Sequence, residues 1–275
     1  MNNITASEVN KLRKATGAGI MDCKNALVES NGDFDLAIEN LRKKGQKVAA
    51  KRADRESSEG AVIAIVNNKN DNGVIISLNC ETDFVGKNES FVTLAKEISE
   101  IALDCDSIDQ LFNSNFDDKM SVKEKLTEQT GVIGEKIEIG SFVKIKSKFV
   151  GSYIHAGNKI ASLVGLTENF DGCGEVAKNI AMQAAAMNPI ALDEEGVDAA
   201  TVEKEIEIAK DQLRQEGKPE AMLDNIAKGK LKRFFKDNTL VNQAYIKDAK
   251  QSVSDYVKSV DPGLSVTGFK RLALV

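Results

Sequence analysis

The chain has 275 residues, enough for about two domains. Hydrophobic residues make up 42% and charged residues 29%, as in ordinary globular proteins, and the formal net charge is −5. Because nucleic-acid binding requires a basic surface, we do not expect this acidic chain to bind nucleic acid directly. The N-terminus lacks the apolar segment of a signal peptide, and no stretch reaches the ~18 apolar residues of a membrane span. We therefore expect a cytoplasmic protein without a membrane partner.

Side chains that usually build catalytic and metal sites are scarce. The four cysteines have no C-x-x-C spacing, which favours reduced, buried thiols; they are Cys23, Cys80, Cys105 and Cys173. His155 is the single histidine. Its surroundings favour a strand histidine satisfied by a backbone group, with a functional role as the alternative. The sequence thus predicts no catalytic residue, no bound metal and no cofactor.

Residues 5–45 predict three short helices. Thr5 and Glu8 have the spacing of a capping box, Asp33 is a helix N-cap, and Gly45 is placed to end the third helix. The charged, weakly patterned residues 46–59 indicate a linker that is helical at most at its start.

Two β-hairpins, each followed by a helix, make up the predicted core. Apolar β-forming runs flank polar turns at residues 61–66 and 74–78, and again at 151–156 and 159–166. Helices are predicted from Phe91 and from Val176 onward. Further strands are predicted at residues 134–139, 142–146, 240–246 and 264–275. The recurrence predicts an α+β fold with two related antiparallel halves.

A charged helical hairpin is predicted to protrude from this core. Its first helix carries the 4-3-4 spacing of a coiled-coil seam at Val202, Ile206, Ala209 and Leu213. The segment Gly217-Lys-Pro219 is typical of a break between two helices. We expect the second helix to return antiparallel from residue 220 to about residue 235.

Residues 172–177 read G-C-G-E-V-A and match the G-x-G-x-x-A pattern of dinucleotide-binding loops. The match is separated from the preceding strand, and no βαβ unit with a ribose-binding acid follows it. A flexible helix entry is therefore preferred, and a cofactor-binding enzyme is kept as a rival hypothesis.

Phe84 is the most informative position in the sequence. It lies in a polar connector, residues 79–88 (N-C-E-T-D-F-V-G-K-N), between a predicted strand and a predicted helix. Two interpretations stay open. The ring either turns inward as a core residue, or it is exposed in order to fill a pocket on another molecule.

Several short motifs follow one another along the chain. They are T-G-A-G-I-M-D-C-K at 16–24, N-G-D at 31–33, L-A-I-E at 36–39, C-E-T-D-F-V at 80–85, G-S-Y-I-H at 151–155, G-K-P at 217–219 and V-T-G-F at 266–269. In this order they resemble bacterial translation elongation factor Ts over essentially the whole chain. The resemblance implies a ubiquitin-associated-like N-terminal bundle, a two-part α+β core and an inserted antiparallel coiled coil. Combined with the predicted elements, it divides the chain into a bundle and linker (1–54), a first core part (55–147), a second core part (148–197 and 237–275) and the hairpin (198–236).

The implied function is guanine-nucleotide exchange on elongation factor Tu, the GTPase that delivers aminoacyl-tRNA to the ribosome. Such a factor binds the GDP-bound GTPase, dislocates its magnesium ion and promotes the exchange of GDP for GTP. It is not an enzyme, and it needs neither a cofactor nor a small-molecule substrate.

The resemblance also implies which residues contact the partner. The T-D-F-V motif maps onto Thr82, Asp83, Phe84 and Val85, where the aromatic ring wedges between two helices of the GTPase. Thr82 and Asp83 are expected to hold the backbone so that the ring points outward. The bundle would dock through Arg13, Ile20, Met21 and Lys24, and the core through Ile133, Gly134, Glu135, His155 and Ile246.

Two departures from the family pattern qualify these expectations. Lys247 stands where an apolar contact residue is expected after Ile246, and the chain ends at Val275 without the extra helical module of longer members. The rival hypothesis within this fold is a helical-bundle adaptor that binds a partner without promoting exchange.

Overall fold

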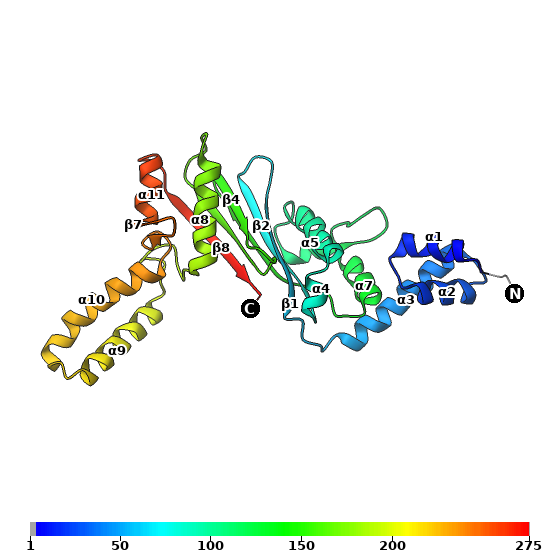
Figure 1. Cartoon of the computed structure of the whole chain (residues 1–275), viewed down its shortest axis with the longest axis horizontal. Helices are drawn as coiled ribbons and strands as arrows, with labels where there is room; N and C mark the ends of the chain where they lie inside the picture. The colour runs from blue at the N-terminus through cyan, green and yellow to red at the C-terminus, as the bar shows by residue number, and fades with distance from the viewer. Residues whose placement is uncertain (1–3, 275) are drawn as a thin grey trace.

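The computed structural model describes residues 4–274 and shows three parts along one long axis (Figure 1). A helical bundle lies at one end, the sheets and their covering helices lie in the middle, and a helical hairpin projects at the other end. The combination of helices with small antiparallel sheets confirms the predicted α+β class. The predicted ranges 1–54 and 237–275 reach into residues outside the described part, and the domain boundaries stay a prediction.

The N-terminal bundle consists of α1 (Ala6–Thr16), α2 (Ile20–Glu29) and α3 (Phe34–Arg52), which confirms three helices. Thr5 and Glu8 form the predicted capping box, and the side chain of Asp33 accepts a hydrogen bond from the N–H of Leu36. The bundle has a small core of its own, built from Val9, Leu12, Ala18, Cys23, Ala26, Leu27 and Ala37.

The prediction that Gly45 ends the third helix is wrong. α3 continues to Arg52, because the alanines and long basic residues after Gly45 are good helix formers. Gly45 is buried against α7 (Val122–Ile133), where a Cβ on Gly131 would lie only 2.4 Å from the Cα of Gly45. The missing side chains therefore allow two helix backbones to meet. The irregular linker is correspondingly shorter than predicted and begins after Arg52.

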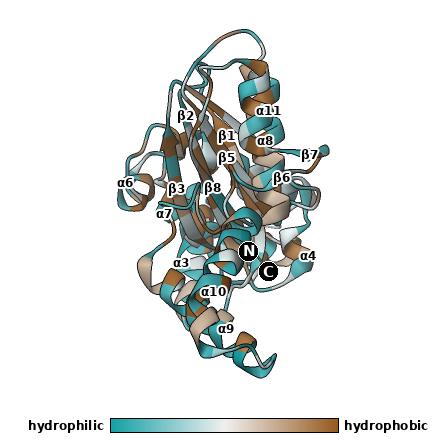
Figure 2. Cartoon of the chain, turned by 90° about the vertical axis from the view of Figure 1, so that its left-hand side faces the viewer, coloured by the Kyte–Doolittle hydropathy of each residue, from teal (hydrophilic) through white to brown (hydrophobic). Residues whose placement is uncertain are grey.

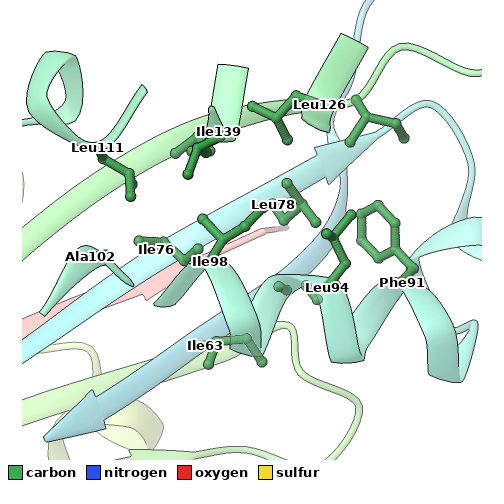
Figure 3. Packing of buried hydrophobic residues seen from close by; sticks show 14 of the residues in the cluster. Ile63, Ile76, Leu78, Phe91, Leu94, Ile98, Ala102, Leu111, Leu126 and Ile139 are labelled. Carbon is green, nitrogen blue, oxygen red and sulfur yellow. The ribbon is translucent and has the colours of Figure 1, made fainter. Parts of the chain in front are cut away.

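The first sheet has the order β1-β2-β3, with β1 (Glu59–Val66), β2 (Asn72–Cys80) and β3 (Glu138–Lys146) all antiparallel. Helix α5 (Glu89–Ala102) covers one face, and Figure 3 shows Phe91, Leu94 and Ile98 packed on the strands. The predicted start of the strand at 134–139 is wrong, because β3 begins only at Glu138. Gly134 ends α7 with a φ of 80°, and β3 then runs as one strand with a register shift at Gly140.

The second sheet has the order β4-β5-β8, with β4 (Phe149–Ile154), β5 (Ile160–Leu166) and β8 (Val266–Ala273). Helix α8 (Cys173–Met187) packs on its outer face. The strand predicted at residues 240–246 does not join this sheet. The N–H groups of Leu240 and Val241 donate to the carbonyls of Ala191 and Leu192, which leaves the sheet edge to β8.

The inner faces of the two sheets pack against each other. Val62, Ala64 and Ile75 of the first sheet contact Val150, Ala161 and Leu163 of the second. Neighbouring residues such as Ile63 and Ile76 point the other way, toward α5. Each sheet is therefore covered on both faces, which explains the nearly continuous apolar runs of the strands. Figure 2 shows the hydrophobic residues concentrated on these central strands.

The projecting hairpin consists of α9 (Ala199–Gln215) and α10 (Glu220–Asn238) and confirms the predicted helix pair. Ala209 and Leu213 of the predicted seam are buried, whereas Val202 and Ile206 are partly buried. Ion pairs join the two helices, from Lys210 to Asp224 at 2.9 Å and from Arg214 to Glu220 at 2.9 Å. The description of this pair as a coiled coil stays a prediction.

Four short elements were not predicted. They are α4 (Asp83–Gly86), α6 (Ile108–Asn113), β7 (Asp248–Ser252) and α11 (Val253–Val260). Of the strand predicted at residues 240–246, only β6 (Ala244–Tyr245) forms, and it pairs with β7. Within residues 4–274, none of the helices combines the length and the apolar character needed to cross a lipid bilayer.

Candidate functional site

Phe84 is the most exposed large hydrophobic residue of the described chain. It lies on the single-turn helix α4, and its side chain is 83% exposed. The next two residues face inward: Val85 packs on the first core cluster, and the buried Gly86 lies against Gly60 of β1. Because successive helical residues are rotated by about 100°, this packing turns Phe84 toward solvent. The interpretation of Phe84 as a core residue is therefore wrong.

Glu135 holds the start of this helix. Its carboxylate accepts hydrogen bonds from the Thr82 hydroxyl at 2.6 Å, the Thr82 N–H at 3.0 Å and the Glu81 N–H at 3.1 Å. Thr82 is the N-cap of α4, but its hydroxyl does not cap the helix, because it donates to Glu135 instead. Two of the predicted contact residues, far apart in sequence, are thus bonded to each other within the chain.

A second carboxylate, Glu81, makes the reciprocal contact. It accepts a hydrogen bond from the Lys136 N–H at 2.7 Å, next to Glu135 in the chain. Nη1 of Arg52, the last residue of α3, donates to both of its oxygens at 2.7 and 2.8 Å. These bonds, above all that from Lys136, hold the pKa of Glu81 below its ordinary value of 4.5. Glu81 is therefore charged at neutral pH, and it connects the loop that presents Phe84 (residues 81–86) to Arg52 and Lys136.

Two further interactions brace α4. The buried thiol of Cys80 donates to the Thr82 carbonyl at 3.1 Å, and burial raises the pKa of this thiol to about 11. Asp83 pairs with Lys87 one turn later at 2.6 Å, and this hydrogen bond lowers the pKa of Asp83. Thr82 and Asp83, which are expected to hold the backbone, thus each have a side-chain partner. Thr82 is bonded to Glu135, and Asp83 is paired with Lys87.

His155 lies at the same end of the stacked sheets as α4. It follows β4 in the turn to β5, where Lys159 pairs with Glu59 at the start of β1. Its Nδ1 lies 3.1 Å from the Tyr153 hydroxyl, and its side chain is exposed. The interpretation as a strand histidine satisfied by a backbone group is therefore wrong, because His155 lies just after β4 and its imidazole contacts the Tyr153 side chain.

The remaining core residues of the predicted interface are spread over two places. Ile133 packs partly into the first core cluster, and Gly134 follows it directly at the end of α7. Ile246 is 39% exposed beside α8, with its N–H bonded to the side chain of Gln183. Lys247, the departure from the family pattern, donates from Nζ to the Asn179 side chain at 2.7 Å. Its ammonium is turned toward α8.

The predicted residues of the bundle lie on α1 and α2, near the connection between the two helices, and all are exposed. Arg13 lies near the end of α1, and Lys24 lies on α2; both are exposed. Ile20 and Met21, at the start of α2, are 53% and 62% exposed. Exposed aliphatic side chains next to basic ones suit contact with a protein surface.

No feature of the described residues supports cofactor or metal chemistry. Gly172 is the N-cap of α8, and the strands of the second sheet are antiparallel, so the G-x-G-x-x-A segment does not lie in a βαβ unit. Within residues 4–274, no cluster of His, Cys, Asp and Glu is arranged to hold a metal ion. The flexible helix entry remains the better interpretation of this segment.

Sequence reasoning missed Arg52, Glu81, Lys87 and Lys136. The i, i+4 spacing of Asp83 and Lys87 could have predicted their pair once a helix was assumed. No local signal links Arg52 to Glu81, because their contact spans 29 positions. Together the fold and the site describe an α+β protein with an exposed aromatic ring on a single-turn helix that Glu135 and Lys87 hold in place.

Comparisons with known proteins agree with this description. A sequence model for the family described as Elongation factor TS matches residues 81–274. The chain is 69% identical over 274 residues to elongation factor Ts of Christiangramia forsetii and 67% identical over 274 residues to that of Flavobacterium psychrophilum, with 100% of both chains covered in each case. Elongation factor Ts of Porphyromonas gingivalis is 43% identical over 273 residues, which is 98% of both chains. The chain therefore belongs to the elongation factor Ts family of translation elongation factors.

Proposed function

We propose that the chain is a guanine-nucleotide exchange factor for elongation factor Tu. It would bind the GDP-bound GTPase, dislocate the magnesium ion and promote release of GDP and its exchange for GTP. The observation that carries this proposal is the exposed ring of Phe84 on a helix braced by Glu135 and Lys87. Its place of action would be the cytoplasm, where translation takes place.

The proposed mechanism requires no bond to be made or broken. A buried aromatic anchor is a typical hot spot of an interface, so Phe84 would gain its binding energy by filling a desolvated pocket between two helices of the GTPase. Linkage requires that the factor weaken GDP binding by the same ratio by which GDP weakens the factor. A ratio of ~10⁴ corresponds to about 5.5 kcal/mol of differential binding, which the ring, the bundle and the core would share.

The bundle, the loop that presents Phe84 and the core would make different contributions to exchange. Arg13, Ile20, Met21 and Lys24 on the bundle would supply docking affinity. Thr82, Asp83, Phe84 and Val85 would act at the magnesium site, next to further contacts from Ile133, Gly134 and Glu135. His155 and Ile246 would extend the interface over the core.

Stopped-flow release of a fluorescent GDP from elongation factor Tu tests this proposal directly. Addition of the chain should accelerate release in a saturable manner, and Phe84→Ala should remove most of the acceleration. The rival function is a helical-bundle adaptor, favoured by the exposed Ile20 and Met21 of α2. An adaptor would bind its partner and leave the release rate unchanged.

A further inference from the structure

One helix connects the bundle to the loop that presents Phe84. α3 starts inside the bundle, where Ala37 is part of the bundle core, and ends at Arg52 against Glu81. Between these points Gly45 meets Gly131 of α7 at backbone contact. A single helix thus contacts the bundle, α7 and the loop in turn.

The same loop is also held from α7. The chain leaves α7 at Gly134 and continues directly into Glu135 and Lys136. Glu135 accepts from Thr82 and Glu81, and the Lys136 N–H donates to Glu81. Three segments therefore form a closed frame: α3, α7 with the residues 134–136 that follow it, and the loop. Each of the three contacts the other two.

Within this frame the contact between α3 and the loop is a single ion pair. The side chains of Arg52 and Glu81 are 34% and 16% exposed, so the pair is shielded better than a surface salt bridge. The neighbouring Lys51 is exposed and makes no ion pair within residues 4–274. Lys51 and Arg52 carry the same charge, so what distinguishes Arg52 from its neighbour is its ion pair with Glu81.

We propose that Arg52 and Glu81 are positioning residues, which fix the end of α3 to the loop so that the bundle and Phe84 meet the GTPase in one relative placement. The inference rests on the proposed exchange function. Preorganised groups bind without the free-energy cost of ordering them. In catalysis, a misplacement of about 1 Å can lower a rate up to ~100-fold. Without the pair, the bundle would still dock, but the ring would reach its pocket in fewer encounters.

The test uses the full chain and the release of fluorescent GDP from elongation factor Tu over a range of factor concentrations. Arg52→Gln removes the positive charge of the pair and Glu81→Gln removes the negative one. Lys51→Gln is the matched control for Arg52→Gln, because it makes the same charge change at an adjacent position. We expect the two test variants to lower the maximal release rate roughly 5- to 10-fold and to change the half-saturating concentration less than about 2-fold. Lys51→Gln should match the wild type in both quantities.

Two further variants separate positioning from general damage. Arg52→Lys keeps a charge that reaches the carboxylate and should restore most of the maximal rate. If Arg52→Gln folds poorly, Glu81→Gln and Arg52→Lys are compared instead. In the Phe84→Ala background, Arg52→Gln should have no further effect on the maximal rate, since there is no ring left to position. A thermal unfolding scan of each variant reports its folded fraction at the assay temperature.

The outcomes are distinguishable. A wild-type chain that leaves GDP release unchanged shows that the proposed function is wrong. If the wild type accelerates release and folded Arg52→Gln equals Lys51→Gln, only the positioning pair is wrong. Equal losses from Arg52→Gln with and without the Phe84 ring also overturn it.

Discussion

Gly131 of α7 touches Gly45 of α3 so closely that a Cβ on Gly131 would lie 2.4 Å from the Cα of Gly45. Real Cβ atoms do not approach other heavy atoms to this distance. The contact is therefore a packing device: it lets a helix of the bundle lie directly on a helix of the core. Residues 46–52, which the sequence assigns to a linker, therefore continue α3, and only the residues after Arg52 are irregular.

Gly131→Ala should consequently force α3 away from α7. We expect a loss of roughly 1–3 kcal/mol in unfolding free energy, as for other overpacked sites, together with faster proteolysis after Arg52. Chemical denaturation and limited proteolysis measure these effects. Gly229→Ala in α10 is the matched control, because a Cβ there meets open space; it should stabilise by ~0.5–1 kcal/mol. Equal behaviour of the two variants would show that the helices separate at no cost.

Phe84→Ala should leave the isolated protein nearly as stable as the wild type. The side chain is 83% exposed, so the expected change in unfolding free energy is within ~0.5 kcal/mol. Phe91→Ala is the comparison, because Phe91 is 2% exposed in the first core cluster and should cost ~3–5 kcal/mol. GDP release should slow in the Phe84 variant. A destabilised Phe84→Ala protein that still promotes normal exchange would contradict the proposed role of the ring.

Met21→Ala should weaken docking without changing the fold. Met21 is 62% exposed, and loss of an aliphatic hot spot typically raises the dissociation constant about 10-fold or more. Titration of nucleotide-free elongation factor Tu by calorimetry gives this constant. Val28→Ala, on the same helix at 55% exposure, is the control and should bind like the wild type. Equal affinities for both variants would place the docking surface elsewhere.

A chain in which residues 204–230 are replaced by a short loop should keep its core. The hairpin base has a separate small cluster of Ala191, Val197 and Phe235, whereas α8 packs in the second core cluster. The main thermal transition should therefore shift by no more than about 3 °C. Ile180→Ala in α8 is the contrasting change; Ile180 is fully buried and should cost ~2–5 kcal/mol. Loss of cooperative unfolding on shortening would make the hairpin part of the core.

The loop that presents Phe84 should loosen in acid. The pKa of Glu81 is below 4.5 in the folded chain, first because of the Lys136 N–H and then because of Arg52. A folded-state pKa below the unfolded value stabilises fully above about pH 4.5, and this stabilisation is lost as the pH falls through the folded-state pKa. A carbon NMR titration should give a Glu81 midpoint below 4.5 that rises in Arg52→Gln but does not reach 4.5, since Lys136 still donates.

Glu8 provides the control in the same titration. Its pKa is also lowered, by hydrogen bonds from Thr5 in the capping box of α1. The midpoint of Glu8 should not respond to Arg52→Gln. A Glu81 midpoint unaffected by this substitution would mean that the ion pair does not form in solution.

Features set by neighbouring residues were readable in the sequence alone. The capping box of Thr5 with Glu8 acts over three residues, and the helix that it starts begins where predicted. The capping box of Ser121 with Glu124 at the start of α7 has the same local spacing. The two hairpins follow from apolar runs around polar turns, so their strands were also predictable. The motif that contains Phe84 identified the candidate site before its geometry was known.

What depended on distant partners was decided only by the tertiary structure. A glycine after a helical pattern can end the helix or admit a neighbouring backbone, and only the presence of Gly131 shows which of the two Gly45 does. The outward direction of Phe84 follows from Gly86 lying against Gly60. The bonds from Thr82 to Glu135 join residues 53 positions apart. Such contacts leave no periodicity in the chain, because packing between elements rather than local backbone preference creates them.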